Sequence, residues 1–102
     1  VEIVKFLVRA GVGKDRTTAD GLSPLYLASK NGHQEIVEFL WEARADLERA
    51  STTGATPVHT ASKNGHVAIV DFLVRAGADL EVTTHNGTTP LYIASENGRL
   101  EV

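Results

Sequence analysis

The sequence contains no cysteine, which excludes disulfide bonds and zinc sites built on thiolates. It also lacks methionine, even at position 1, and aromatic residues make up only 6% of the chain. No apolar run approaches the roughly 20 residues of a membrane-spanning helix, and no signal-peptide pattern opens the chain. We therefore expect an intracellular protein, cytoplasmic or nuclear, with no membrane insertion.

A surplus of basic residues is missing as well. The 102 residues include 10 Lys and Arg against 13 Asp and Glu, and the formal net charge is −3. This balance argues against nucleic acid and anionic membranes as partners, because both favour a basic face. The chain is 42% hydrophobic and 23% charged, which is an ordinary composition for one folded domain or a short array of repeats.

The chain repeats itself with a period of 33 residues. Three segments align without a gap, beginning at Asp20, Thr53 and Asn86, and residues 2–11 match residues 68–77 in the same register. Within the segments a glycine, a proline and a second glycine keep their places: Gly21, Gly54 and Gly87; Pro24, Pro57 and Pro90; Gly32, Gly65 and Gly98. A fixed period of this length is typical of a repeat architecture.

Each unit predicts two short helices and a loop. A hydroxyl residue precedes each proline, as in an N-cap followed by proline at the first helical position: Ser23, Thr56 and Thr89. Asn31-Gly32 ends the first helix, and a second helix is expected at 34–42 because its apolar residues recur at helical spacing. The segment 78–87 has the chemistry of turns. Helices this short are stable only when neighbouring units cover their apolar faces.

These units resemble ankyrin repeats, whose 33-residue unit carries a G-x-T-P-L-H-x-A signature. The matching segments run from Gly21 to Tyr26, from Gly54 to His59 and from Gly87 to Tyr92. The resemblance implies an all-α fold class, an ankyrin-repeat solenoid of stacked helix-turn-helix units joined by β-hairpin-like loops. In the family's frame, residues 1–102 form a single solenoid with repeats at 20–49 and 53–82 and partial repeats at 1–16 and 86–102. We therefore expect an internal slice of a longer array.

The resemblance also implies a function, a non-catalytic protein–protein interaction module that binds another protein and needs no cofactor or metal. In the family, the loop tips and the solvent face of the first helices form a concave recognition surface. By register, that surface takes here Asp20, Leu22, Tyr26, Lys30, Thr52, Thr53, Lys63, His85, Asn86, Thr88, Tyr92 and Glu96. Tyr26 and Tyr92 are the expected anchors, because tyrosine is enriched in binding hot spots.

The alternative function is a structural spacer or scaffold segment of a longer ankyrin array, with no ligand of its own. The free variation of the loop tips between repeats fits a recognition surface and unconstrained solvent exposure equally well. The sequence leaves the oligomeric state open, and we expect a monomer for the isolated chain.

Two departures between repeats lead to structural expectations. Arg44 stands where Gly11 and Gly77 end the equivalent helices, and we expect it in a left-handed conformation that costs about 1 kcal/mol. Trp41 stands where other units have valine, and we expect its ring to fill space between repeats rather than to bind a partner.

Patterns of enzyme and ligand chemistry are absent from the sequence. Gly11-Val12-Gly13-Lys14 suggests a phosphate loop but lacks the first glycine, and Asp15 replaces the hydroxyl residue that would reach magnesium. Its register with residues 77–81 makes it a helix end and loop. His33 and His66 are repeat-equivalent, and stacked repeats about 10 Å apart would hold them too far apart to share a zinc ion.

Overall fold

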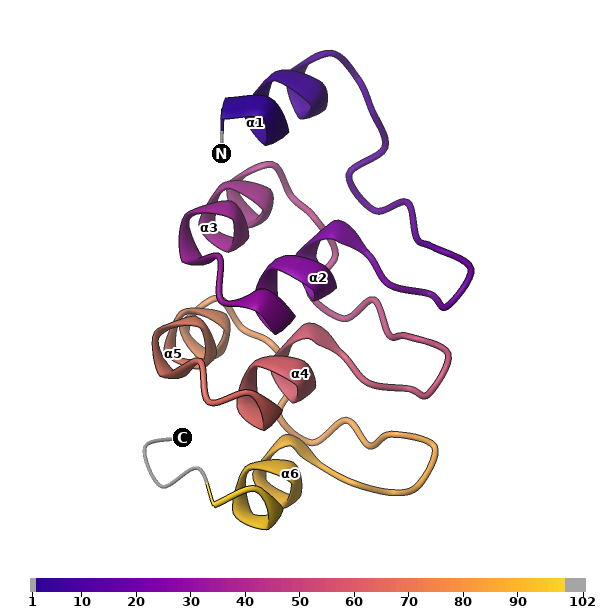
Figure 1. Cartoon of the computed structure of the whole chain (residues 1–102), viewed down its shortest axis with the longest axis vertical. Helices are drawn as coiled ribbons and strands as arrows, with labels where there is room; N and C mark the ends of the chain where they lie inside the picture. The colour runs from indigo at the N-terminus through magenta and orange to yellow at the C-terminus, as the bar shows by residue number, and fades with distance from the viewer. Residues whose placement is uncertain (1, 99–102) are drawn as a thin grey trace.

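Paired helices and long loops alternate along the chain. The computed structural model describes residues 2–98, and no strand is found in that range. Its helices are α1 (Glu2–Arg9), α2 (Pro24–Asn31), α3 (Gln34–Glu42), α4 (Pro57–Lys63), α5 (Val67–Arg75) and α6 (Pro90–Glu96). In Figure 1 the first helices α2, α4 and α6 form one column, the second helices α1, α3 and α5 form another, and the loops project to one side. This arrangement confirms the all-α solenoid.

The first helices begin and end as the sequence predicts. The Ser23 Oγ accepts a hydrogen bond from the Tyr26 backbone N–H at 3.1 Å, and the Thr89 Oγ1 accepts one from Tyr92 at 3.2 Å. At the other end Gly32 adopts a φ of 77°, which only glycine adopts without strain. These caps are local, so each helix pair carries its own start and stop signals.

The core lies between the two columns of helices. Leu25 on α2 and Leu40 on α3 are each 1% exposed, and Leu73 on α5 is fully buried. Each first helix packs against the second helix of its own repeat and against the first helix of the next one: α2 against α3 and α4, and α4 against α5 and α6. Burial is therefore shared between neighbours, as in other solenoids.

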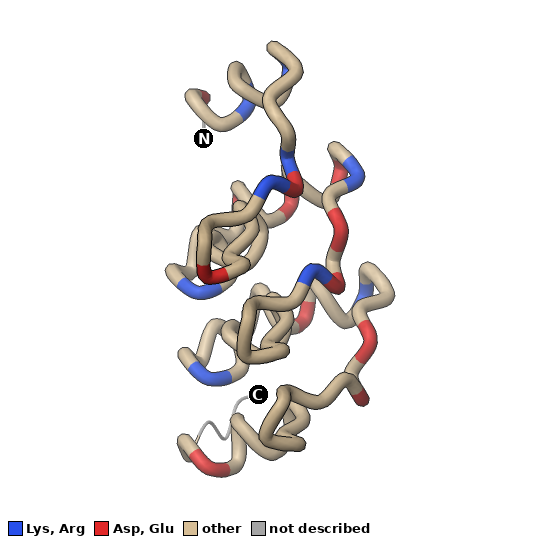
Figure 2. Tube along the Cα trace, turned by 90° about the vertical axis from the view of Figure 1, so that its right-hand side faces the viewer, with Lys and Arg blue, Asp and Glu red and all other residues tan. Residues whose placement is uncertain are grey.

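The loops are hairpin-like and are hydrogen-bonded to one another. Within one loop the Ser51 N–H donates to the Ala55 carbonyl at 2.8 Å. Between loops the Thr52 N–H donates to the Asp20 carbonyl at 3.0 Å, and 33 residues later the His85 N–H donates to the Thr53 carbonyl at 2.9 Å. The stacked loops thus form a continuous polar edge, along which charged residues of both signs recur (Figure 2).

A second set of bonds joins the segments that follow the second helices. The Asp15 carboxylate accepts a hydrogen bond from the Asp46 N–H at 2.8 Å, and the Glu48 carboxylate accepts one from the Asp79 N–H at 2.8 Å. Asp15, the residue that departs from the phosphate-loop pattern, therefore connects its loop to the next repeat. The glycine-lysine stretch before it follows α1 as a helix end and loop, as predicted.

Trp41 lies between repeats but is not fully covered. Its ring meets the ring of Phe72 on α5 edge to face, with the centroids 5.5 Å apart. The side chain remains 43% exposed. The expected contact between repeats is therefore present, on the outer side of the second helices.

Arg44 occupies the left-handed region, as expected, with a φ of 70°, and it is the only non-glycine residue of the described chain with a positive φ. We predict that Arg44→Gly raises the melting temperature, because glycine removes a backbone penalty of about 1 kcal/mol. Thermal unfolding followed by circular dichroism measures the shift. The reverse change at the equivalent position, Gly77→Arg, should lower the melting temperature, since Gly77 has a φ of 96°. An unchanged melting temperature for Arg44→Gly would contradict the predicted backbone strain at Arg44.

Candidate functional site

A shallow groove runs between the loops and the first helices. Three successive repeats contribute to it, so no single repeat forms it alone. It is lined by Tyr26, Lys30, Thr53, Ala55, His59, Thr60, Lys63, Asn64, Thr84, Asn86, Thr88, Ile93, Glu96 and Asn97. The lining is mixed, with hydroxyls, amides, two lysines, a glutamate and few apolar side chains. Such a lining suits a polar protein segment better than an apolar small molecule.

The expected surface residues divide between this groove and its surroundings. Those that line the groove are Tyr26, Lys30, Thr53, Lys63, Asn86, Thr88 and Glu96. Asp20, Thr52 and His85 are exposed at the loop tips, outside the groove lining, and Leu22 is half-buried at the base of its loop. Tyr92 is 56% exposed on α6 but does not line the groove, whereas Tyr26 is half-buried in it.

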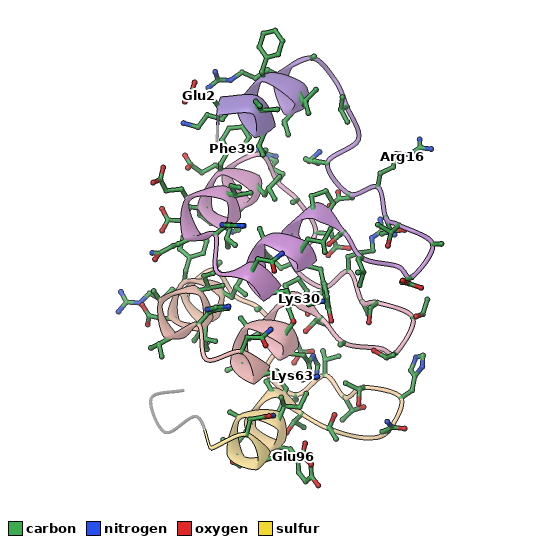
Figure 3. All side chains as sticks on the ribbon, in the orientation of Figure 1. Glu2, Arg16, Lys30, Phe39, Lys63 and Glu96 are labelled. Atoms are coloured by element: carbon green, nitrogen blue, oxygen red, sulfur yellow. The ribbon has the colours of Figure 1, made fainter. Side chains whose placement is uncertain are left out.

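Three groove residues form a charged row at equivalent positions. Lys30, Lys63 and Glu96 lie one above another at the ends of the first helices (Figure 3). The neighbouring asparagines behave differently, because the side-chain amides of Asn31, Asn64 and Asn97 donate to the carbonyl four residues earlier at 3.0, 3.1 and 2.9 Å. The asparagines therefore support the helix ends, while the residue before each one changes from lysine to glutamate along the groove.

His59 lies at the base of the groove and is 1% exposed. Its Nδ1 accepts a hydrogen bond from the Thr56 N–H at 3.0 Å, and its Nε2 faces the Thr88 carbonyl at 3.2 Å. A backbone N–H can only donate, so the proton of the neutral ring must be on Nε2. Desolvation by burial lowers the pKa of His59, although the Thr88 carbonyl and the charge of Glu48 act in the opposite direction. His59 thus joins two repeats beneath the groove as a neutral side chain.

The other histidines have structural contacts or lie at the surface. The His66 Nε2 is 2.9 Å from the Lys30 carbonyl and connects two repeats. The His85 ring lies against Gly54, where an added Cβ would be 2.8 Å from the His85 Cδ2. Over residues 2–98, no group of three or more His, Asp or Glu side chains is placed to hold a metal ion.

Some groove residues were not among those predicted from the sequence. Thr60 and Ile93 are equivalent positions on α4 and α6, and Thr84 precedes a loop tip. Thr60 lies three residues before Lys63, so helical spacing places both on one face. That spacing could have added Thr60 to the predicted surface. However, the number of residues from one helix that reach the groove depends on how the loop of the next repeat lies beside that helix.

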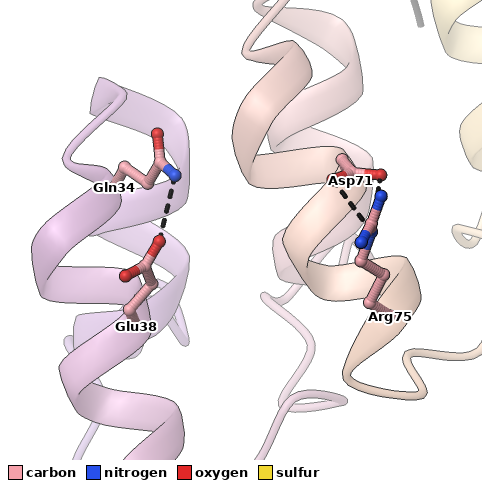
Figure 4. Close-up of polar contacts among 4 residues, drawn as sticks. All are labelled: Gln34, Glu38, Asp71 and Arg75. Atoms are coloured by element: carbon pink, nitrogen blue, oxygen red, sulfur yellow. Dashed lines mark hydrogen bonds and ion pairs between the residues drawn. The ribbon is translucent and has the colours of Figure 1, made fainter.

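The outer face of the second helices carries polar and charged side chains that pair within their own helix (Figure 4). Gln34 donates to Glu38 at 3.0 Å on α3, and Arg75 pairs with Asp71 at 3.1 Å on α5. Such exposed pairs contribute only a few tenths of a kcal/mol. This face therefore offers control positions away from the groove.

Comparison with known proteins bears on the fold. A family model described as ankyrin repeats (3 copies) matches residues 1–84 and 43–102, which together cover the chain. No curated protein matches significantly. No helix within residues 2–98 is long and apolar enough to cross a membrane. Since the matched regions cover the whole chain and the helix pairs stack as described, the chain belongs to the ankyrin repeat family.

Proposed function

We propose that the chain is a non-catalytic protein-binding module whose groove receives a segment of another protein. Ankyrin repeats are in general protein–protein interaction modules. The observation that carries the proposal is the row formed by Lys30, Lys63 and Glu96, which lines the groove across three repeats and changes sign along it. The adjacent asparagines stay fixed because they cap helices.

The chemistry of the groove indicates the kind of partner. An acidic side chain of the partner would suit Lys30 and Lys63, and a basic one would suit Glu96, because opposite charges across an interface fix its register. Tyr26 supplies the aromatic surface that often anchors such contacts. Nucleic acid fits less well, since the row ends in a carboxylate and the chain carries a net charge of −3.

Site-specific photo-crosslinking distinguishes this function from that of a spacer. A photoreactive residue at Thr53 in the groove is compared with one at Glu35 on α3, both exposed, in extract of the source organism. A binding module gives a discrete protein adduct from position 53 that position 35 does not give. A spacer gives no adduct specific to the groove, and that outcome would refute the proposal.

Charge reversal in the groove then tests the binding mode with the captured partner. We predict that Lys30→Glu weakens the affinity for the partner by about 1–3 kcal/mol, roughly 5-fold to 150-fold, because a like charge then faces the acidic side chain of the partner. Isothermal titration calorimetry measures the change. Arg75→Glu on the outer face is the matched control and should bind as the wild type does, since the Arg75 side chain is 79% exposed on α5. Equal losses from both variants would indicate a non-specific charge effect.

A further inference from the structure

The two departures from the repeat pattern described above, Trp41 and Arg44, belong to the same surface cavity. Trp41 stands where the equivalent positions have valine, and Arg44 stands where they have glycine. The cavity is open, has a volume of about 600 Å³ and lies at the C-terminal end of α3. Its lining consists of Trp41, Glu42, Arg44, Ala45 and Leu47. One repeat therefore carries a surface here that its neighbours do not have.

This surface lies inside the stack, because α3 is the middle one of the three second helices (Figure 1). On one side the Lys5 Nζ of α1 lies 5.8 Å from the centroid of the Phe39 ring. On the other side the Trp41 ring meets the Phe72 ring of α5. With both neighbours in place the Trp41 side chain is still 43% exposed, and Arg44 is exposed as well. The free part of the indole offers the mixed apolar and polar surface that is enriched at protein interfaces.

Arg44 has a backbone conformation that glycine would adopt without strain. Its φ of 70° lies in the left-handed region that Gly11 and Gly77 occupy at the equivalent positions. No carboxylate of residues 2–98 forms an ion pair with the Arg44 guanidinium, so the described fold gains no such bond in return for the strain. Strained residues of this kind cluster at binding sites, and the free guanidinium favours that role for Arg44.

We propose that this cavity is a second protein-binding site, which receives an apolar side chain of a partner on the Trp41 indole and an adjacent carboxylate on the Arg44 guanidinium. Tryptophan and arginine are among the residue types most enriched in binding hot spots. A guanidinium binds a carboxylate through two parallel hydrogen bonds, which fixes the position of the partner. Glu42, also exposed in the lining, favours a basic residue elsewhere on the same segment and so helps to orient it.

The cavity shares no lining residue with the groove between the loops and the first helices. The proposal therefore goes beyond the proposed function and stands independently of it. It also assigns the exposed part of Trp41 a role in addition to its contact between repeats.

Two variants that restore the residues of the other repeats separate binding from folding. Arg44→Gly should raise the melting temperature, so a loss of binding in this variant cannot result from unfolding. Trp41→Val introduces the residue that α1 and α5 carry at the equivalent positions, and circular dichroism verifies that the variant folds. Arg44→Lys keeps the positive charge and distinguishes its effect from that of the backbone conformation.

A phage-displayed library of random peptides supplies the probe. Peptides are selected on the full chain and depleted on Trp41→Val, so that the survivors depend on the indole. Their sequences should share an apolar residue next to an aspartate or a glutamate. A synthetic peptide of that sequence should change the fluorescence of Trp41, which is the single tryptophan of the chain. Its affinity, measured by isothermal titration calorimetry, should fall about 10-fold to 100-fold in Arg44→Gly and only about 3-fold in Arg44→Lys.

The other outcomes would overturn the proposal. If no peptide survives the depletion, the cavity does not bind protein segments. Survivors that lack an acidic residue, or that bind Arg44→Gly as tightly as the wild type, would show that Arg44 does not select a carboxylate. Lys30→Glu is the control, because it changes the groove alone, and it should bind the peptide as the wild type does. A loss of affinity in Lys30→Glu would show that the peptide occupies the groove instead.

Discussion

Leu73→Ala is expected to lower the free energy of unfolding by about 2–5 kcal/mol, the usual cost of truncating a buried leucine. Leu73 has no exposed surface and belongs to the core formed by α4 and α5 with their neighbours. The loss is large compared with the total stability of roughly 5–15 kcal/mol that a domain possesses. Urea unfolding followed by circular dichroism measures it.

Leu7→Ala is the matched control, because the same side chain is removed at the equivalent register position. Leu7 is 47% exposed on α1, so its removal should cost about 1 kcal/mol or less. The comparison separates the effect of tertiary packing from that of local sequence, because both leucines precede the same Val-Arg-Ala-Gly segment. Equal losses for the two variants would show that α1 is covered as fully as the interior helices.

Local structure was predictable from the sequence because its causes are local. The second helix expected at 34–42 is α3 (Gln34–Glu42), since an apolar stripe defines it and the glycine turn before it fixes its start. Arg44 was expected in the left-handed region only because its two equivalents are glycine. In a solenoid the conformation of one repeat thus predicts that of the others, because each repeat contacts only its neighbours.

The groove was less predictable, because it forms between repeats rather than within one. Tyr26 and Tyr92 occupy equivalent positions, yet only Tyr26 lines the groove. Tyr26 shares the groove with Thr53 on the loop of the next repeat, and residues 2–98 contain no such loop after Tyr92. A register aligns positions, but it does not say which neighbouring loop lies beside a side chain. Asp20 likewise does not line the groove, although its equivalents Thr53 and Asn86 do, because the neighbours of its loop differ.

The hydrogen bonds between loops could not be predicted from the residues alone. Asp15 and Glu48 differ in length, yet each carboxylate accepts a bond from the next repeat at 2.8 Å. In sequence they are acidic residues in a loop, for which solvent exposure is the ordinary interpretation. The stacking distance makes them structural, and that distance results from the packing of the helices.

Acidification is expected to weaken the fold through His59. Burial holds the pKa of this ring below its ordinary value of 6.5. On acidification below about pH 6.5, the unfolded chain therefore binds a proton that the folded chain does not. The stability from the neutral ring is complete above that pH and decreases as the pH falls toward the lowered pKa. The physical cause is local, because a protonated Nδ1 cannot accept the Thr56 N–H bond at 3.0 Å.

His59→Tyr tests this linkage with a residue that the neighbouring repeats already carry at Tyr26 and Tyr92. The variant should lose about 1–3 kcal/mol at neutral pH, because the Thr56 N–H and the Thr88 carbonyl lose their partner. Its urea midpoint should then change less than that of the wild type between about pH 7 and about pH 5. His33→Gln removes an exposed ring and should keep the dependence of the wild type. If the urea midpoint of His59→Tyr instead changed with pH as much as that of the wild type, the buried ring would not be the source of the pH dependence. The interpretation of His59 as a neutral link between two repeats would then be wrong.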